Sequence, residues 1–483
     1  MEAKSITQTK DMIVDLIKQP LSEKIEVTGT KIHDALINGA IDFASDTIHE
    51  LSSWFADLVW EAYLTSLFQT AMILKWLRKL GAKKGMRFVS YQTIWITLPT
   101  GTKIQIRSPF FVKASPKRGR KKRGPQKRGE HLLLSIMGFV DKVAPDLAFR
   151  AIQLSILCPS FDIASKTLKQ EGINLSANQI RRLVSEMESP NLCSRVDRVL
   201  GDDDASLFKG RRILLAADGG RLRQRKNKRG PRPSGYKRCG FKTDWIEPKL
   251  FTLYVLDEDG NIVKTVAPFV DGTTGKVDEF ITLLEQYLVR LRIEEASEVV
   301  LIGDGAPWIW ERIPKLIYSI AGEEFKLTEI IDWTHAKQNL NKAFEMVSKK
   351  KREKVDFNHF KNLLFSGKIN EIVTEVKSLL NVRASSKIMK KLKSYFVSNS
   401  TRMQYEANRA IKLPTGSGVI ESAIRRVINM RVKSPGSFWK LDFVETVIYL
   451  RAQILYGRWG NIIKNWAYSL QCDFMHIATK AEI

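Results

Sequence analysis

The stretch VVLIGDGAPWIW, residues Val299–Trp310, is the part of the sequence that indicates the fold most clearly. Its first four residues form an apolar run that is short enough to be a buried strand. The run stops at Gly303-Asp304-Gly305, where the glycines allow a sharp turn, and Pro307 then stands where proline is favoured in a first helical turn. This pattern predicts a strand, a tight turn and a helix, with the Asp304 carboxylate at the strand tip.

A second apolar run, Arg212–Ala217, ends in the same way at Asp218-Gly219-Gly220. Between residues 212 and 335 the pattern alternates between strands and helices, and Asp257–Gly260 predicts a hairpin turn. The expected strands are 212–217, 250–256, 261–266, 298–303 and 329–333, with helices at 276–292 and 307–318. Three antiparallel strands, a helix and two more strands broken by helices is the order of the ribonuclease-H-like fold. The predicted class is therefore α/β with a mixed sheet.

Helical periodicity, turn residues and charge divide the rest of the chain. Residues 336–413 are lysine-rich and helical, which predicts an all-α insertion ahead of a helix at 419–429. The predicted segments are an N-terminal helical region (1–82), a β-hairpin segment (83–112), a basic flexible linker (113–130), a helix-turn-helix-like DNA-binding domain (131–200), the first part of a ribonuclease-H-like catalytic domain (201–335), the α-helical insertion (336–413), and the second part of the catalytic domain with the C-terminal tail (414–483).

The charge balance points to a polyanionic partner. The chain has 78 Lys+Arg and 52 Asp+Glu, a net charge of +26. Cationic surface gains affinity for nucleic acid by releasing counterions from phosphates, although an anionic membrane surface is an alternative. The longest uncharged run of the apolar region 51–80 covers only 62–74, short of the ~20 residues that a spanning helix needs. We expect a cytoplasmic, soluble protein that binds double-stranded DNA and no membrane.

Two segments have the composition of DNA-contacting elements. The segment 113–129 has nine basic residues and no acidic one, so it is expected to be a flexible arm on DNA or a merely solvated connector. Residues 161–183 have helix-turn-helix spacing, with Gly172 at the turn and Ser176 as the cap of the second helix, although plain helix packing would give the same pattern. The candidate DNA-binding side chains in these segments are Lys117, Arg118, Arg120, Lys121, Lys122, Arg123, Asn178, Gln179, Arg181 and Arg182.

The candidate catalytic residues are Asp218, Asp304 and Glu421. Phosphodiester chemistry needs hard cations that neutralise the attacking and leaving oxygens, and carboxylates suit Mg²⁺ or Mn²⁺. We expect these three residues to bind two such ions. Each also has a structural interpretation, because aspartate is common in turns after strands and glutamate stabilises a first helical turn.

Other polar residues form a second group of candidates. Asp332 and His335 could hold a metal-bound water or a phosphate, or could cap a helix. The basic residues Arg221, Arg223, Arg425 and Arg426 could bind DNA phosphates near the carboxylates, although a solvated face is the default.

At these residues the sequence resembles the Kra-type group of bacterial insertion-sequence transposases, which are DDE transposases. The resemblance covers roughly residues 130–460 and is carried by the motifs ADGGR (217–221), WIEPKL (245–250), GDGAPWIW (303–310), DWTHA (332–336), LPTGSGVIESAIRR (413–426) and LRAQ (450–453). It implies a DDE triad at Asp218, Asp304 and Glu421, a helical insertion before the glutamate, and strand transfer at transposon ends. It also implies inverted repeats and target DNA as partners, a homo-oligomer in a synaptic complex, and a place at the bacterial nucleoid.

Two other functions remain open from the sequence. A ribonuclease-H-like nuclease or resolvase would hydrolyse DNA without joining ends. A non-catalytic DNA-binding repressor would not need Glu421, so the intact set of three carboxylates counts against it.

Overall fold

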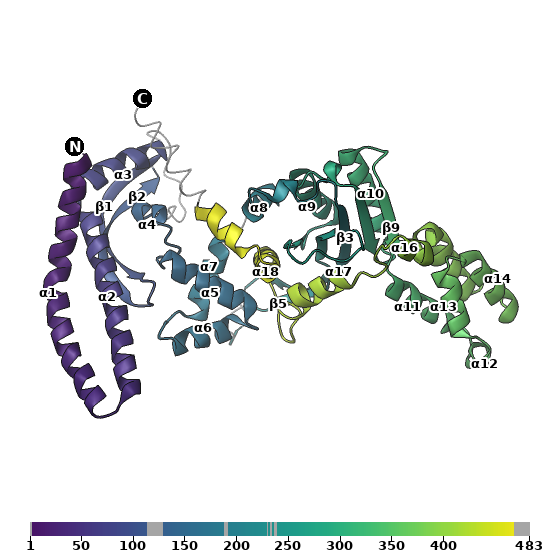
Figure 1. The fold of residues 1–483 in the computed structure, drawn as a ribbon, viewed down its shortest axis with the longest axis horizontal. Coiled ribbons are helices and arrows are strands. Elements are labelled where there is room, and N and C mark those ends of the chain that lie inside the picture. The colour runs from purple at the N-terminus through teal and green to yellow at the C-terminus, as the bar shows by residue number, and fades with distance from the viewer. Residues whose placement is uncertain are drawn as a thin grey trace. The chain divides into compact units, whose positions relative to one another are not determined.

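The computed structural model describes residues 2–113, 129–187, 192–228, 230–231, 234–235 and 239–467. Most of the expected basic linker, and all six of its candidate residues from Lys117 to Arg123, lie outside the described residues. The chain forms two compact units, which are Met1–Met187 with Ile463–Ile483, and Glu188–Ile462. Figure 1 shows their elements.

The first unit begins with helices and a long hairpin. Its elements are α1 (Glu2–Ile37), α2 (Ile41–Gln69), α3 (Ala71–Lys83), β1 (Met86–Thr97), β2 (Lys103–Lys113), α4 (Leu132–Ile136), α5 (Pro145–Leu157), α6 (Phe161–Gln170) and α7 (Ala177–Glu186). β1 and β2 pair in antiparallel register across the Pro99–Gly101 turn that the sequence predicts. Their apolar positions pack with α2, α3 and α4 around Leu64, Leu77 and Phe111.

The hairpin and the helix-turn-helix belong to one packed body. The Thr97 N–H donates to Lys142 O at 2.9 Å, and the Ala144 N–H donates to Thr97 O at 2.9 Å. A Cβ on Gly101 would lie 3.0 Å from Cγ1 of Ile173, next to the turn between α6 and α7. Residues that the sequence divides between two segments therefore share one core.

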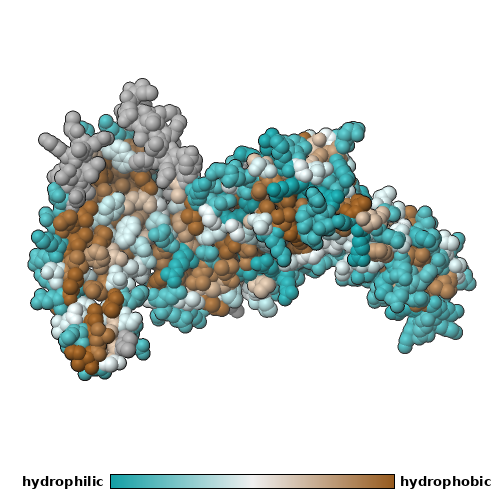
Figure 2. All heavy atoms as spheres, viewed as in Figure 1, coloured by the Kyte–Doolittle hydropathy of each residue, from teal (hydrophilic) through white to brown (hydrophobic). Residues whose placement is uncertain are grey.

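The α1–α2 pair leaves apolar side chains uncovered. Val14, Leu16, Ile25, Val27 and Leu36 are 43–56% exposed on α1. Figure 2 shows apolar side chains at the surface of these two helices. No described helix combines the length and the apolar character that a membrane crossing requires.

The second unit is built on a mixed five-stranded sheet of order β7-β6-β3-β8-β9. Its strands and the helices between them are α8 (Leu192–Val199), β3 (Arg212–Gly219), β4 (Leu222–Asn227), β5 (Phe241–Ile246), β6 (Lys249–Leu256), β7 (Phe269–Thr273), α9 (Val277–Arg290), β8 (Glu298–Gly303), α10 (Pro307–Ala321) and β9 (Leu327–Ile331). β8 is buried at every position and β3 at five successive positions, as expected for strands covered on both faces. The α/β class with a mixed sheet is therefore confirmed.

One predicted strand is wrong. Asn261–Val266 was expected to be a strand paired with 250–256, but it forms only an antiparallel bridge of Ile262 with Leu256, and the strand neighbours of β6 are β3 and β7 (Phe269–Thr273). Asp257 does form the predicted turn, because its Oδ1 accepts the N–H groups of Asp259 and Asn261. All five β7 residues are buried, whereas Asn261, Lys264 and Thr265 are polar side chains that such a buried position would leave without water.

The region between β9 and the helix of Glu421 is entirely helical. Its elements, continued to the end of the sheet domain, are α11 (Trp333–Phe344), α12 (Lys349–Arg352), α13 (Phe357–Phe365), α14 (Ile369–Leu379), α15 (Lys387–Lys391), a π-helical turn (Leu392–Phe396), a 3₁₀ segment (Val397–Arg402), α16 (Tyr405–Ala410), α17 (Gly418–Ala423), a second π-helical turn (Ile424–Asn429) and α18 (Leu441–Leu455). The buried positions 420, 423, 424, 427 and 428 place one face of α17 and its continuation on the sheet, and Glu421 stays on the exposed side.

A buried ion cluster ties α8, β7 and α18 together. Arg195 is 2% exposed and donates to Asp271 Oδ1 and to Glu445 Oε1, each at 2.8 Å. Glu445 also accepts the Thr274 N–H at 2.6 Å. Burial alone would raise the pKa of Glu445, but the Arg195 charge and the Thr274 hydrogen bonds outweigh it and lower that pKa.

Replacing Arg195 by Met should destabilise the second unit by about 3–5 kcal/mol, because two buried carboxylates lose their counter-charge. Urea unfolding followed by tryptophan fluorescence measures this change. The control is Arg290→Met, which removes an ion pair with Asp197 that is about half exposed and should cost no more than ~1 kcal/mol. Equal losses in the two variants would contradict the expected role of Arg195.

Candidate active site

The register of the sheet aligns three aspartates at one edge. β3 pairs in parallel with β8, which places Ala217 opposite Gly303, and β8 pairs in parallel with β9, which places Gly303 opposite Ile331. The next residue on each strand is an aspartate, namely Asp218, Asp304 and Asp332. Since neighbouring strands lie ~4.8 Å apart, the three carboxylates form a row at the carboxyl end of the parallel strands.

Both carboxylate oxygens of Asp332 accept hydrogen bonds from backbone N–H groups. Its side chain is 1% exposed. Oδ1 accepts the His335 N–H at 2.7 Å and thereby caps α11, and Oδ2 accepts the Ser417 N–H at 2.5 Å. The Trp333 N–H also donates to Thr415 O at 3.0 Å. The helix-capping interpretation of Asp332 is thus correct, and the same carboxylate fixes the loop that leads to Glu421.

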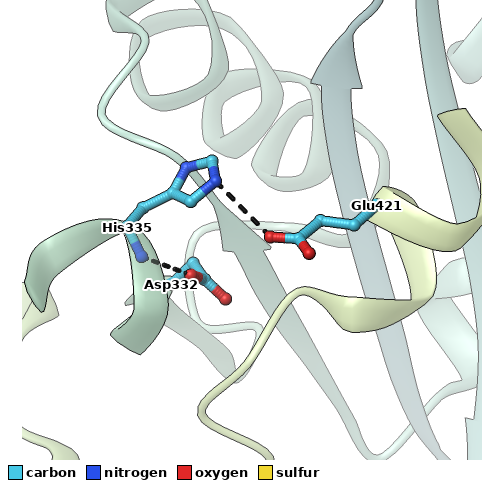
Figure 3. A group of neighbouring side chains, drawn as sticks. All are labelled: Asp332, His335 and Glu421. Atoms are coloured by element: carbon cyan, nitrogen blue, oxygen red, sulfur yellow. Dashed lines mark hydrogen bonds and ion pairs between the residues drawn. The ribbon is translucent and has the colours of Figure 1, made fainter. Parts of the chain in front are cut away.

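Glu421 reaches the row from α17. This helix packs on β3 and β6, and the Glu421 side chain is 48% exposed. His335 Nε2 lies 3.4 Å from Glu421 Oε1. Figure 3 shows His335 and Glu421 pointing toward each other, with Asp332 beside them. The structure therefore brings a glutamate that is remote in the sequence to the edge where the aspartates stand.

The ligand atoms that lie nearest together belong to Asp332, His335 and Glu421. One atom of each residue lies within 4.8 Å of the others, close enough to share a metal ion. This set overlaps the predicted set of Asp218, Asp304 and Glu421 only at Glu421. Asp332 already accepts two backbone N–H groups, so we regard it as the residue that positions the other two.

Burial and like charges raise the pKa of Asp218 to about 6. Burial of the carboxyl is the largest cause, and the charges of Asp304 and Glu421 add to it. The Gly219 N–H, which donates to Asp218 Oδ1 at 2.6 Å, and the charge of His335 act in the opposite direction. A partly buried Asp218 with two further carboxylates close enough to raise its pKa fits a divalent cation, because the cation would offset the repulsion.

Asp304 lies in the turn that its neighbouring glycines predict. Its Oδ1 accepts the Ala306 N–H at 2.8 Å, and its backbone O accepts Nε1 of Trp310 at 2.8 Å. A Cβ on Gly305 would lie 2.2 Å from the ring of Tyr395, so the glycine leaves room for that ring. Burial and the Asp304 charge raise the pKa of Tyr395. The sequence analysis missed Tyr395, because nothing in its local pattern indicates contact with Asp304.

The remaining candidates have other surroundings. In α7, Gln179 completes a capping box with Ser176, and Arg182 pairs with Asp141 at 2.8 Å. Asn178 and Arg181 are exposed on the same helix and bond to each other at 3.3 Å. Arg221 and Arg223 lie at the base of a two-stranded ribbon, β4–β5, that is not among the strands expected from the sequence. Arg425 is exposed, and the Arg426 guanidinium lies 5.1 Å from the centroid of the Tyr456 ring.

Comparison with known proteins adds little. No protein-family model matches the sequence, and no curated protein matches it. Among solved structures, the Drosophila P element transposase strand transfer complex matches with 16% identity, covering 67% of this chain and 81% of that chain. The TM-score is 0.25, too low to establish a shared fold.

Replacing Asp332 by Ala should loosen the Glu421 loop, because the N–H groups of Ser417 and His335 both lose a buried acceptor. We expect a loss of about 2–4 kcal/mol in unfolding free energy and faster hydrogen exchange at residues 415–421. Ser386→Ala is the control, since it removes a single cap bond of 3.5 Å to Met389 N, and it should leave that exchange unchanged. Unaltered exchange at 415–421 in the Asp332 variant would contradict the anchoring role.

The raised pKa of Asp218 predicts a pH-dependent affinity for Mn²⁺. The ion binds the ionised carboxylate, so a proton competes with it below pH 6. Affinity should fall up to about tenfold per pH unit there and level off above pH 6. Titration of free Mn²⁺ by electron paramagnetic resonance at pH 5–7 measures this. Asp218→Asn should flatten the profile and Asp244→Asn, at an exposed site, should preserve it; a steep profile in the Asp218 variant would contradict the assignment.

Proposed function

We propose that this protein is a DDE-type DNA transposase of the kind its motifs resemble, with Asp218, Asp304 and Glu421 as the catalytic carboxylates. The observation that carries the proposal is the alignment of Asp218 and Asp304 at the ends of adjacent parallel strands, with Glu421 reaching the same edge from α17 and acting on the Asp218 pKa. In this proposal the protein binds the inverted repeats of its element and target DNA in a homo-oligomeric synaptic complex at the bacterial nucleoid.

The topology supports a ribonuclease-H-like catalytic domain. The strand order β7-β6-β3-β8-β9 combines an antiparallel half with a parallel half, and in chain order three antiparallel strands precede α9 and the two parallel strands follow it, although the third strand is β7 and not the expected 261–266. Both proposed aspartates end strands of the parallel half, and residues 333–413 form a helical insertion between the sheet and the Glu421 helix. This arrangement lets residues from three distant parts of the chain act at one place.

Each proposed side chain has a definite task. The carboxylates of Asp218, Asp304 and Glu421 would hold two Mg²⁺ or Mn²⁺ ions, which supply charge neutralisation at the attacking and leaving oxygens of a phosphodiester. His335 lies beside Glu421 and orients its carboxylate. Asp332 fixes the loop before α17 through the Ser417 N–H. The backbone of Glu421 is therefore held in place even though the Glu421 side chain is half exposed. Asp218 must lose its proton before it can bind a cation.

The charge of the protein supports DNA as the substrate. The net charge of +26 favours binding of phosphates. In the second unit the β4–β5 ribbon carries arginines directly after Asp218, and in the first unit α7 exposes Asn178 and Arg181. We assign backbone contacts and end recognition to these two elements, respectively.

Replacing Asp304 by Asn should abolish metal-dependent cleavage of DNA that carries the inverted repeats flanking the gene. A loss of at least ~100-fold is expected, because bound metal supplies several kcal/mol of transition-state stabilisation. DNA binding without added metal should survive. A gel assay of nicking with Mn²⁺ gives the first value and a mobility-shift assay gives the second.

The control is Asp259→Asn, which removes an exposed carboxylate far along the chain from the proposed triad and should retain cleavage. Retained cleavage in the Asp304 variant would reject the proposal. Cleavage without joining of a pre-cut end would support a nuclease or resolvase instead, and activity indifferent to Glu421→Gln would support a non-catalytic repressor.

A further inference from the structure

The β4–β5 ribbon extends the β3–β6 hairpin beyond the edge of the sheet. β3 pairs with β6 as far as Gly219, and β4 pairs with β5 from Leu222 outward. The ribbon therefore begins within a few residues of Asp218. Trp245 stands opposite Arg223, five positions past Asp218, or about 17 Å at ~3.3 Å per residue if the chain is extended.

The ribbon is held in place rather than free. The Arg225 N–H donates to Trp439 O at 2.6 Å, and the Trp439 N–H donates to Arg223 O at 3.1 Å. Trp439 is 8% exposed and its Nε1 donates to Val432 O at 2.9 Å. The outer edge of β4 is thus bonded to a buried residue of the second unit, and its side chains keep a fixed direction.

The two faces of the ribbon differ in composition. Residues opposite each other in an antiparallel pair point to the same face, so Arg223 and Arg225 share a face with Trp245 and Phe241. The other face has Lys226 and Lys242 opposite each other, and Asp244 pairs with Lys226 at 2.8 Å. The first face combines cations with aromatic rings, whereas the second face has two lysines and one aspartate and no aromatic ring.

The arginines of the first face lie over aromatic rings. Arg221 and Arg223 lie 4.5 and 4.9 Å from the centroid of Trp245, and Arg225 lies 4.4 Å from that of Phe241. Among the described residues, none of the three forms an ion pair. Trp245 is nevertheless 43% exposed and Phe241 37%. Cations that no protein carboxylate pairs with, beside exposed aromatic rings, are available to a ligand that has both anionic and aromatic groups.

A cleft of about 550 Å³ lies at the base of this face. It is lined by Gly219, Arg221, Trp245, Glu247, Asn429 and Lys433, among others. Asn429 Oδ1 is buried and has no hydrogen-bond partner among the described residues. The cleft is within the size range of small-ligand sites, and it combines an aromatic ring, two cations, an amide and the carboxylate of Glu247.

We infer that this face and cleft bind an unpaired DNA strand. One base of the strand stacks on Trp245, and the phosphates of the strand are held by Arg221, Arg223 and Lys433. The inference rests on the proposed function in taking DNA as the ligand. Aromatic rings with interleaved cations bind single strands, because every base has a π-face and the backbone is anionic. In a duplex those base faces are covered by their neighbours, so a stacking ring beside the strand would find nothing to stack on.

The experiment compares two DNA probes with the full-length protein in EDTA, so that no cleavage occurs. One probe is a blunt duplex and the other is the same duplex with a short 3′ tail that contains 2-aminopurine. The protein should bind the tailed probe more tightly and quench the 2-aminopurine. Trp245→Ala should weaken binding of the tailed probe about 5- to 100-fold, abolish the quenching, and leave binding of the blunt probe within about twofold.

Two matched variants make the result specific. Trp245→Phe retains a stacking ring and should keep most of the preference for the tail. Trp95→Ala removes another exposed tryptophan, which is 59% exposed on β1, and should change neither probe. Circular dichroism checks that each variant folds.

The outcomes separate this inference from the proposed function. Equal binding of the two probes by the unaltered protein would overturn the inference, and so would equal weakening of both probes in Trp245→Ala, which would indicate a contact with duplex DNA. Because no metal is present, a preference for the tail that is lost in Trp245→Ala supports the inference even if the Asp304→Asn experiment rejects catalysis.

Discussion

The carboxylate of Asp332 joins two parts of the chain that lie 85 residues apart in sequence. Asp332 directly follows β9, and its Oδ1 accepts the His335 N–H and caps α11. Its Oδ2 accepts the Ser417 N–H, directly before the first residue of α17. Glu421 lies in α17, which with the π-helical turn that continues it runs only from Gly418 to Asn429 and is too short to be stable without tertiary contacts. The geometry of the acidic site therefore depends on a buried side chain whose own oxygens are used for structure.

The same site shows how repulsion is built into a fold. Asp218 and Asp304 are placed side by side by the register of β3 and β8, and Glu421 adds a third negative charge. Burial is the largest cause of the raised pKa of Asp218, and the charges of Asp304 and Glu421 add to it. By contrast, Asp271 and Glu445 share the guanidinium of Arg195 in the same unit. Those two acids have a counter-charge within the protein, whereas among the described residues Asp218 and Asp304 form no ion pair with a lysine or arginine.

Sequence patterns predicted the elements that are marked by residues close together in the chain. Apolar runs that end in Asp-Gly gave β3, β8 and the positions of Asp218 and Asp304, and Ser176 marked the start of α7. The β4–β5 ribbon was not predicted as strands. Both of its strands are mostly polar or charged, and neither alternates apolar with polar residues as a half-buried strand does. The second bond of Asp332 and the contact of Tyr395 with Gly305 join residues far apart in sequence, so no local pattern can reveal them.

The helical region between β9 and α17 leaves and rejoins the sheet domain at a single point. The Trp333 N–H bonds to Thr415 O and the Ser417 N–H bonds to Asp332, so its first and last residues touch. A segment whose ends are already together adds little closure entropy to the domain that carries it. Its length can therefore vary at little cost in closure entropy, but part of its content is tied to the acidic site, because Tyr395 packs beside Gly305 and Arg402 pairs with Glu329 of β9. A different helical body grafted at this junction would leave the sheet edge unchanged only if it supplied these two contacts.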